Sequence, residues 1–135
     1  MARPESKIEV LPNRNKSRKF VSRHVFSELT SLCPVTRLPD FYSVELTYEP
    51  DRLLPELKSL KLYFLTYRNV EILHEELANQ ILEDIAKTTK PRWAQIVLKV
   101  NNRGGVTTTV ARRWNRSKGD EQVDLKVLDW NIDAD

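Results

Sequence analysis

The segment EILHEELANQILEDIAK (residues 71–87) has the apolar spacing of an amphipathic helix. Leu73, Leu77, Ile81 and Ile85 recur at every fourth position, so they share one face of a helix. The residues between them are mostly polar or acidic, as is typical of the opposite, solvent-facing side. The pattern predicts a helix that buries one row of side chains against another layer of structure.

A second helix is expected just before it, in PELKSLKLYFLTYRN (residues 55–69). Its apolar residues repeat at helical spacing, and Pro55 suits a first helical turn. An apolar run this short is also compatible with a strand. Because only a short break at Asn69 and Val70 separates the two segments, we expect a helical hairpin.

Strand patterns flank this hairpin on both sides. They are rich in β-branched and aromatic residues and lie at residues 19–29, 41–50, 92–102 and 106–114. The order predicts a β-β-α-α-β-β domain of the α+β class, with four antiparallel strands and the helical pair on one face. Such a sheet has two open edges, so we expect closure through neighbouring subunits into a barrel.

The 135 residues have 40% hydrophobic content and a net charge of +3, from 22 Lys and Arg against 19 Asp and Glu. This composition is typical of one soluble globular domain. We expect a flexible basic arm at residues 1–18, the folded domain at 19–114 and an acidic tail at 115–135. No apolar run could cross a membrane, and a single cysteine excludes an intrachain disulfide, so a cytoplasmic location is expected.

The loop SLCPVTRLPDF (residues 31–41) holds that cysteine, Cys33, between two prolines and before Asp40. A lone cysteine is most often an inert buried residue. A thiol with an ordinary pKa of ~8.5 needs a proton acceptor to act as a nucleophile. Asp40 would serve if burial raised its pKa, although it could equally cap the turn.

Two further groups have the character of binding residues. Glu75, next to His74 in the first turn of the expected helix 71–87, could accept hydrogen bonds from two N–H groups of a guanine-like ring. Lys58 and Lys61 lie three residues apart near a helix N-terminus and would form a phosphate-sized positive site, or a simple solvated face. His24, His74 and Cys33 are possible metal ligands, but no two of them have metal-ligand spacing, so no metal is expected.

Taken together, these motifs resemble the QueF family, the nitrile reductases of queuosine biosynthesis. SLCPVT, PDF, ELKSLKLY, YRN, HEE and RGG occur in the family's order and spacing, and the likeness covers residues 20–114. The resemblance implies a tunnelling fold (T-fold) that assembles into a homo-oligomer, a pentamer or decamer, with active sites between subunits. It also implies reduction of 7-cyano-7-deazaguanine to 7-aminomethyl-7-deazaguanine with two NADPH.

The resemblance assigns roles to individual positions. Cys33 corresponds to the nucleophile that forms a thioimide with the nitrile, and Asp40 to the general acid/base. The binding positions comprise Glu56, Leu57, His74 and Glu75 for the base, and Lys58, Ser59, Lys61 and Arg103 for the nicotinamide cofactor. Arg37 and Leu38 depart from the family pattern, in which a small residue precedes a polar one.

Other functions remain open on the sequence. A QueF-like amidinotransferase would form the same thioimide on a nitrile already in tRNA and add ammonia to give archaeosine, but ELKSLKLY favours reduction. A basic nucleic-acid-binding module is a different class, and the mild net charge argues against a stable nucleic-acid complex. An inactive homologue would not be expected to keep Cys33, Asp40 and Glu75.

Overall fold

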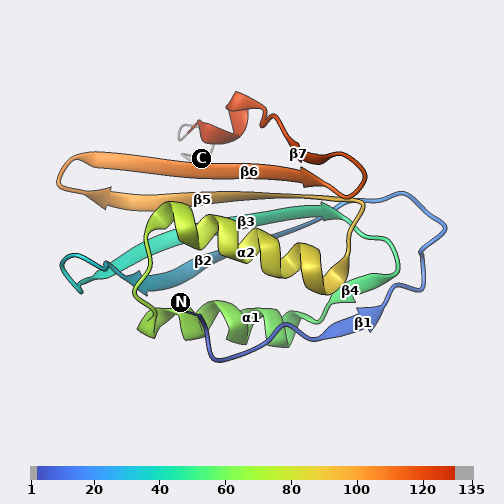
Figure 1. The fold of residues 1–135 in the computed structure, drawn as a ribbon, viewed down its shortest axis with the longest axis horizontal. Coiled ribbons are helices and arrows are strands. Elements are labelled where there is room, and N and C mark those ends of the chain that lie inside the picture. Colours follow the sequence, from blue (N-terminus) through green and yellow to red (C-terminus); the bar gives the residue numbers. More distant parts are fainter. Residues whose placement is uncertain (1–2, 130–135) are drawn as a thin grey trace.

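The computed structural model describes residues 3–129, apart from the side chain of Arg103, and consists of a twisted antiparallel sheet with two helices against one face (Figure 1). The sheet has five strands in the order β2-β3-β5-β6-β7. Their bounds are β2 Ser22–Leu32, β3 Pro39–Glu49, β5 Trp93–Arg103, β6 Val106–Asn115 and β7 Gly119–Glu121. Among the described residues, no helix is both long and apolar enough to span a membrane.

The helical pair has the positions that the apolar spacing predicted. Helix α1 (Leu57–Thr66) continues into a 3-10 turn, η1 (Tyr67–Asn69), and α2 spans His74–Thr89. Residues 57–69 are therefore helical and not a strand, but Pro55, expected in the first helical turn, instead ends the short strand β4 (Leu53–Pro55). The carboxylate of Glu56 caps α1, because it accepts hydrogen bonds from the backbone N–H groups of Lys58 and Ser59 at 2.6 and 3.0 Å.

The apolar row of α2 forms the centre of the core. Leu77, Ile81 and Ile85 are fully buried against the sheet, and each such side chain contributes about 1.5–3 kcal/mol by leaving water. Leu73, which the spacing placed in the same row, instead precedes the first turn as the N-cap and is 47% exposed. Helix α1 packs on β2, where the rings of Phe26 and Phe64 stack 5.2 Å apart.

The predicted β-β-α-α-β-β order and α+β class are confirmed, and the chain adds short elements at both ends. Strand β1 (Val10–Pro12) pairs with β4 (Leu53–Pro55), so part of the basic N-terminal segment is ordered against the domain. Ser59 explains this attachment, because its buried hydroxyl accepts a hydrogen bond from the Glu9 N–H at 2.8 Å. At the other end, β7 pairs with β6, and a 3-10 turn, η2 (Leu125–Leu128), follows.

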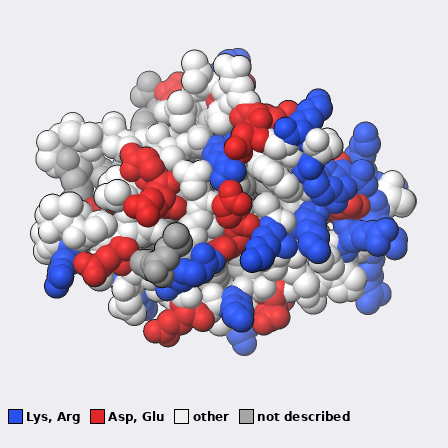
Figure 2. Space-filling view, in the orientation of Figure 1, with Lys and Arg blue, Asp and Glu red and all other residues white. Residues whose placement is uncertain are grey.

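Charge is distributed unevenly over the molecule. Figure 2 shows Lys and Arg side chains gathered at the end where β1 and β4 lie in Figure 1, with acidic side chains spread over the rest of this face. The basic end is opposite the β2–β3 connection, residues 33–38. On this face, the Lys and Arg side chains are therefore concentrated away from that loop.

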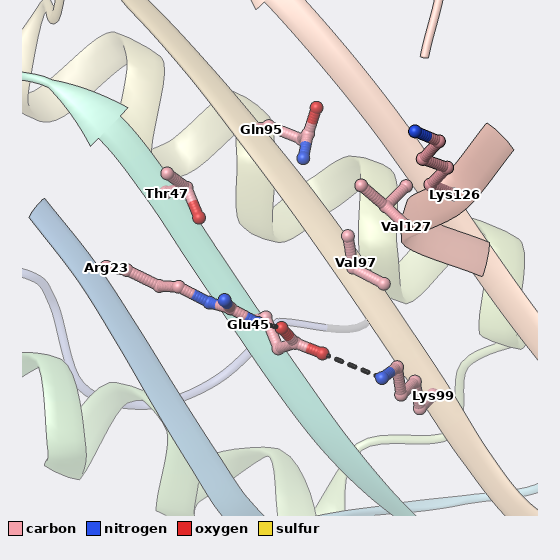
Figure 3. Close-up of a pocket in the computed structure, with 8 residues that line it drawn as sticks. All are labelled: Arg23, Glu45, Thr47, Gln95, Val97, Lys99, Lys126 and Val127. Carbon is pink, nitrogen blue, oxygen red and sulfur yellow. Dashed lines mark ion pairs between the residues drawn. The ribbon is translucent and has the colours of Figure 1, made fainter. Parts of the chain in front are cut away.

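A buried charge cluster lies on the face of the sheet that the helices leave uncovered. Figure 3 shows Glu45 of β3 between Arg23 of β2 and Lys99 of β5, with Nζ of Lys99 3.1 Å from the Glu45 carboxylate. Glu45 and Lys99 are only 7% and 6% exposed. Because burial disfavours the charged amine, the pKa of Lys99 is lowered. The pairing with Glu45 is what makes a charged lysine tolerable there.

Replacing Glu45 by Gln should therefore lower the free energy of unfolding by about 2 kcal/mol, because the Lys99 charge would lose its buried partner. Urea denaturation at fixed protein concentration measures the change. Glu83→Gln is the matched control: that carboxylate pairs with Arg112 at 2.7 Å but is 63% exposed, so the loss should stay below about 0.5 kcal/mol. Equal losses in the two variants would contradict the burial argument.

Candidate active site

The β2–β3 hairpin brings the predicted nucleophile and acid to the same end of the sheet. Ser31 of β2 is paired with Asp40 of β3, so Cys33 and Asp40 flank the connection. Inside it, the Cys33 N–H donates to the Leu38 carbonyl at 2.9 Å, and the Arg37 N–H donates to the Cys33 carbonyl at 2.7 Å. These two bonds hold the loop closed and fix the backbone at the thiol.

The N-terminus of α2 is fastened to this hairpin through the backbone. The Leu32 N–H donates to the Val70 carbonyl at 2.9 Å, and the Ile72 N–H donates to the Leu32 carbonyl at 3.0 Å. The residue before Cys33 is thereby tied to the segment that leads into α2. His74 and Glu75, in the first turn of that helix, consequently lie beside the thiol loop.

Tyr42 lies at the centre of this group and was not singled out as a site residue from the sequence. Its hydroxyl is 3.1 Å from Nδ1 of His74, and its phenol is close enough to Asp40, Cys33 and Glu75 for their charges to affect it. In the sequence, Tyr42 had only the alternation of a core residue. The structure thus brings together four of the predicted site residues, Cys33, Asp40, His74 and Glu75, around a tyrosine.

The thiol is in a setting that favours its ionised form. Hydrogen bonds from the backbone N–H and the hydroxyl of Thr36, and from the Val35 N–H, lower the pKa of Cys33 from its ordinary value. The nearby Asp40 charge opposes this shift. Cys33 is partly exposed, whereas Asp40 is 6% exposed. A partly exposed sulfur with a lowered pKa therefore lies near a carboxyl group that is largely shielded from water.

The remaining predicted binding residues other than Arg103 form a second cluster at the start of α1, whereas Arg103 ends β5 at the end of the sheet that carries the thiol loop. Helix α1 has ten residues, about 15 Å, and runs from β4 to the end of the sheet that carries the 33–38 loop (Figure 1). Leu57 and Lys61 line an open cleft of ≈ 510 Å³ along β2. Within one chain, Leu57 and Lys58 are thus separated from the thiol loop by most of the helix, and Lys61 by about half of it.

Members of the second cluster differ in how available they are. The Glu56 carboxylate is engaged as the α1 cap, and the buried Ser59 hydroxyl donates to the Glu56 carbonyl while accepting from Glu9. Lys58 and Lys61 are exposed. Arg103 ends β5, and its side chain lies outside the described part of the structure. The lysines are therefore the groups of this cluster that can reach a ligand.

Arg37, which stands where the family pattern has a small residue, makes a contact of its own in the structure. Its φ angle is +62°, in the left-handed region that favours glycine, and its guanidinium is 3.3 Å from the Glu71 carboxylate. Leu38 beside it is 52% exposed. The arginine thus accepts a strained backbone and adds a side-chain contact between the thiol loop and the segment before α2.

Comparison with known proteins gives consistent matches. Residues 39–119 match the family described as QueF-like protein. NADPH-dependent 7-cyano-7-deazaguanine reductases of Syntrophus aciditrophicus and Halorhodospira halophila are 39% and 45% identical, over 85% and 79% of this chain and 82% and 91% of theirs. The crystal structure of an archaeosine synthase QueF-Like in the apo form superposes with a TM-score of 0.65 at 28% identity, covering 69% of this chain and 91% of that one.

The Cys33 thiol should react with iodoacetamide at a lower pH than an ordinary exposed cysteine, because its pKa is lowered. The pH at half-maximal rate should rise in Thr36→Val, which loses the hydroxyl hydrogen bond, and fall in Asp40→Asn, which loses the opposing charge. Rates measured across a pH series give the three midpoints. Identical midpoints in all three proteins would show that these groups do not tune the thiol.

Proposed function

The chain belongs to the QueF-like protein family, and from this premise we propose that it is a cytoplasmic NADPH-dependent reductase that converts 7-cyano-7-deazaguanine to 7-aminomethyl-7-deazaguanine in queuosine biosynthesis. The observation that carries the proposal is the grouping of a partly exposed, acidified thiol with a shielded carboxyl and the Glu75 carboxylate at one end of the sheet. That grouping suits a nitrile attached to a guanine-like base.

Cys33 supplies the nucleophile. Its thiolate adds to the nitrile carbon while Asp40 delivers the thiol's proton to the nitrile nitrogen, which gives a thioimide. A C=N group that carries sulfur accepts hydride more readily than a nitrile, whose reduced nitrogen anion is poorly stabilised. NADPH supplies two hydrides in turn. After the first, the thiolate leaves and an imine remains; the second reduces that imine to the amine, with one proton taken up at each reduction.

Glu75 and His74 hold the base. A carboxylate in the first turn of α2 is favoured by the partial positive charge of the helix N-terminus and accepts hydrogen bonds from the two adjacent N–H groups of the guanine edge. Glu56 and Leu57 lie at the start of α1, away from Cys33 within one chain, so in this proposal they complete the pocket from a neighbouring subunit. The base is thereby oriented with its nitrile toward Cys33.

The cofactor site is assigned to the second cluster. Lys58 and Lys61 are exposed cations near the N-terminus of α1, a donor set that fits the phosphate groups of a dinucleotide. Ser59 lies in the same turn of α1 and belongs to the proposed cofactor site through that position. Arg103 is proposed to add a phosphate contact from a neighbouring subunit. These residues would anchor the cofactor and orient its reactive ring.

The separation of the two clusters supports active sites that lie between subunits. Lys58 lies in the first turn of α1 and Cys33 lies beyond its other end, and this separation supports a site in which a neighbouring chain supplies one of the two clusters. The sheet offers edges for such assembly, because in the described part of the chain β6 pairs with β7 only over residues 113–115. We propose a homo-oligomer, a pentamer or decamer, whose sheets close into a barrel.

An amidinotransferase is the second candidate, and the structural match to an archaeosine synthase favours it. Such an enzyme shares the thioimide but consumes ammonia instead of hydride. The two functions therefore differ in what resolves the intermediate and not in how it forms.

Mixing the purified protein with 7-cyano-7-deazaguanine should produce the absorbance of a thioimide, and NADPH should then be consumed at two equivalents per nitrile. Cys33→Ala should abolish the absorbance, because no other cysteine exists to form the adduct. Asp40→Asn should reduce turnover at least about a hundredfold, the scale of general acid–base catalysis, with binding of the base retained. An adduct that ignores NADPH and reacts with ammonia would establish the amidinotransferase instead.

Co-expression of two inactive variants should test whether sites are shared. Cys33→Ala and the double variant Lys58→Glu/Lys61→Glu remove different clusters, so their mixed oligomers should regain activity at sites that combine two intact contributions. Cys33→Ala mixed with Asp40→Asn is the matched control and should regain none, because both residues come from the same hairpin. The same result for both pairs, in oligomers verified as mixed, would refute the shared site.

A further inference from the structure

A hydrogen-bonded chain of three side chains runs from the buried β2–β3 hairpin to the first turn of α2. The Ser31 hydroxyl lies 2.7 Å from the Tyr42 hydroxyl, which lies 3.1 Å from Nδ1 of His74. Ser31 and Tyr42 are 0% and 1% exposed, and the Tyr42 and His74 rings meet edge to face with centroids 5.5 Å apart. The imidazole is therefore supported both by a hydrogen bond and by packing.

The direction of these hydrogen bonds follows from the buried serine. Within residues 3–129, the side-chain hydroxyl of Ser31 has one hydrogen-bond partner, Tyr42. A buried donor left unsatisfied costs more than a lone pair left unused, so Ser31 donates to Tyr42. Since a phenol has one proton, Tyr42 then donates to Nδ1 of His74. Burial raises the pKa of Tyr42 to about 12, so that proton is present at neutral pH.

The consequence concerns the tautomer of the histidine. When Nδ1 accepts a hydrogen bond, the proton of neutral imidazole resides on Nε2. His74 then offers a ligand a donor, while the neighbouring Glu75 offers acceptors. This pattern complements the edge of a guanine-like base, which presents a ring carbonyl beside two N–H groups.

We infer that Tyr42 and Ser31 are positioning residues that hold His74 as the Nε2–H tautomer, so that it donates to the carbonyl of the bound base. The inference rests on the proposed function, in which His74 and Glu75 bind a deazaguanine. Without Tyr42, the imidazole is free to turn and to exchange tautomers. Only a fraction of the protein then presents the donor, and affinity for the base falls in proportion to that fraction.

The chain contains a matched control in a second tyrosine–histidine pair. Tyr48 is 2% exposed, its hydroxyl lies 2.8 Å from Nε2 of His24, and the ring centroids are 5.6 Å apart. Burial raises its pKa to about 12 as well. Tyr48→Phe thus removes the same kind of hydrogen bond from the same sheet, at the end of β2 away from the thiol loop.

The test compares Tyr42→Phe with Tyr48→Phe by kinetics and by ¹⁵N NMR of the imidazoles. The chain has two histidines, so His24→Gln assigns the spectrum. In the unaltered protein, His74 should show the Nε2–H signature. Tyr42→Phe should mix the tautomers and raise KM for 7-cyano-7-deazaguanine about tenfold, with kcat changed less than about twofold. Tyr48→Phe should leave the His74 signals unchanged and should change KM far less than Tyr42→Phe does.

Ser31→Ala removes the first link while leaving the tyrosine ring in place, and circular dichroism checks that each variant is folded. It should shift His74 in the same direction as Tyr42→Phe, by a smaller amount. An Nδ1–H signature in the unaltered protein, or no tautomer change in Tyr42→Phe, would overturn the inference. If the tautomers behave as expected but the unaltered protein forms no adduct with the nitrile, the proposed function fails and the positioning of His74 stands.

Discussion

Two backbone hydrogen bonds between the end of β2 and the segment before α2 hold the candidate site together. The Leu32 N–H donates to the Val70 carbonyl, and the Leu32 carbonyl accepts from the Ile72 N–H. The residue before the thiol is thereby joined to a stretch that ends two residues before His74. These bonds link elements that are far apart in the sequence. The placement of His74 and Glu75 beside the thiol loop depends on this junction.

Polar side chains lie next to this junction, at the edge of a tightly packed core. Ser31, Asp40 and Tyr42 are nearly inaccessible, and Ser31 and Tyr42 are satisfied by side-chain hydrogen bonds in place of water. The same principle operates on the face of the sheet without helices, where the Glu45 carboxylate forms ion pairs with Arg23 and Lys99. Buried polar groups thus occur both at the thiol loop and on the helix-free face, and at each place side-chain partners satisfy them.

Helix α1 divides the proposed chemistry into two halves. Its length keeps the exposed lysines of its first turns away from the thiol loop, although both clusters lie along the same strand, β2. The capping of α1 by Glu56 and the burial of Ser59 show that some residues of the ELKSLKLY motif have structural work in the free chain. A motif can therefore combine residues that build a helix start with residues that face a ligand.

The sequence alone determined the order of elements and the placement of Cys33 and Asp40 at the two ends of one short loop. Both depend on local periodicity and on a hairpin that closes within a few residues. Its apolar rows predicted both helices, although Leu73 falls outside the helix it was assigned to. Only the tertiary structure decided that the basic N-terminal segment adds a strand, that Arg37 bridges to Glu71, and that Tyr42 reaches His74. The reason is physical: a periodic pattern reports which face of an element is apolar, whereas contacts between distant segments depend on how those faces are brought together in space.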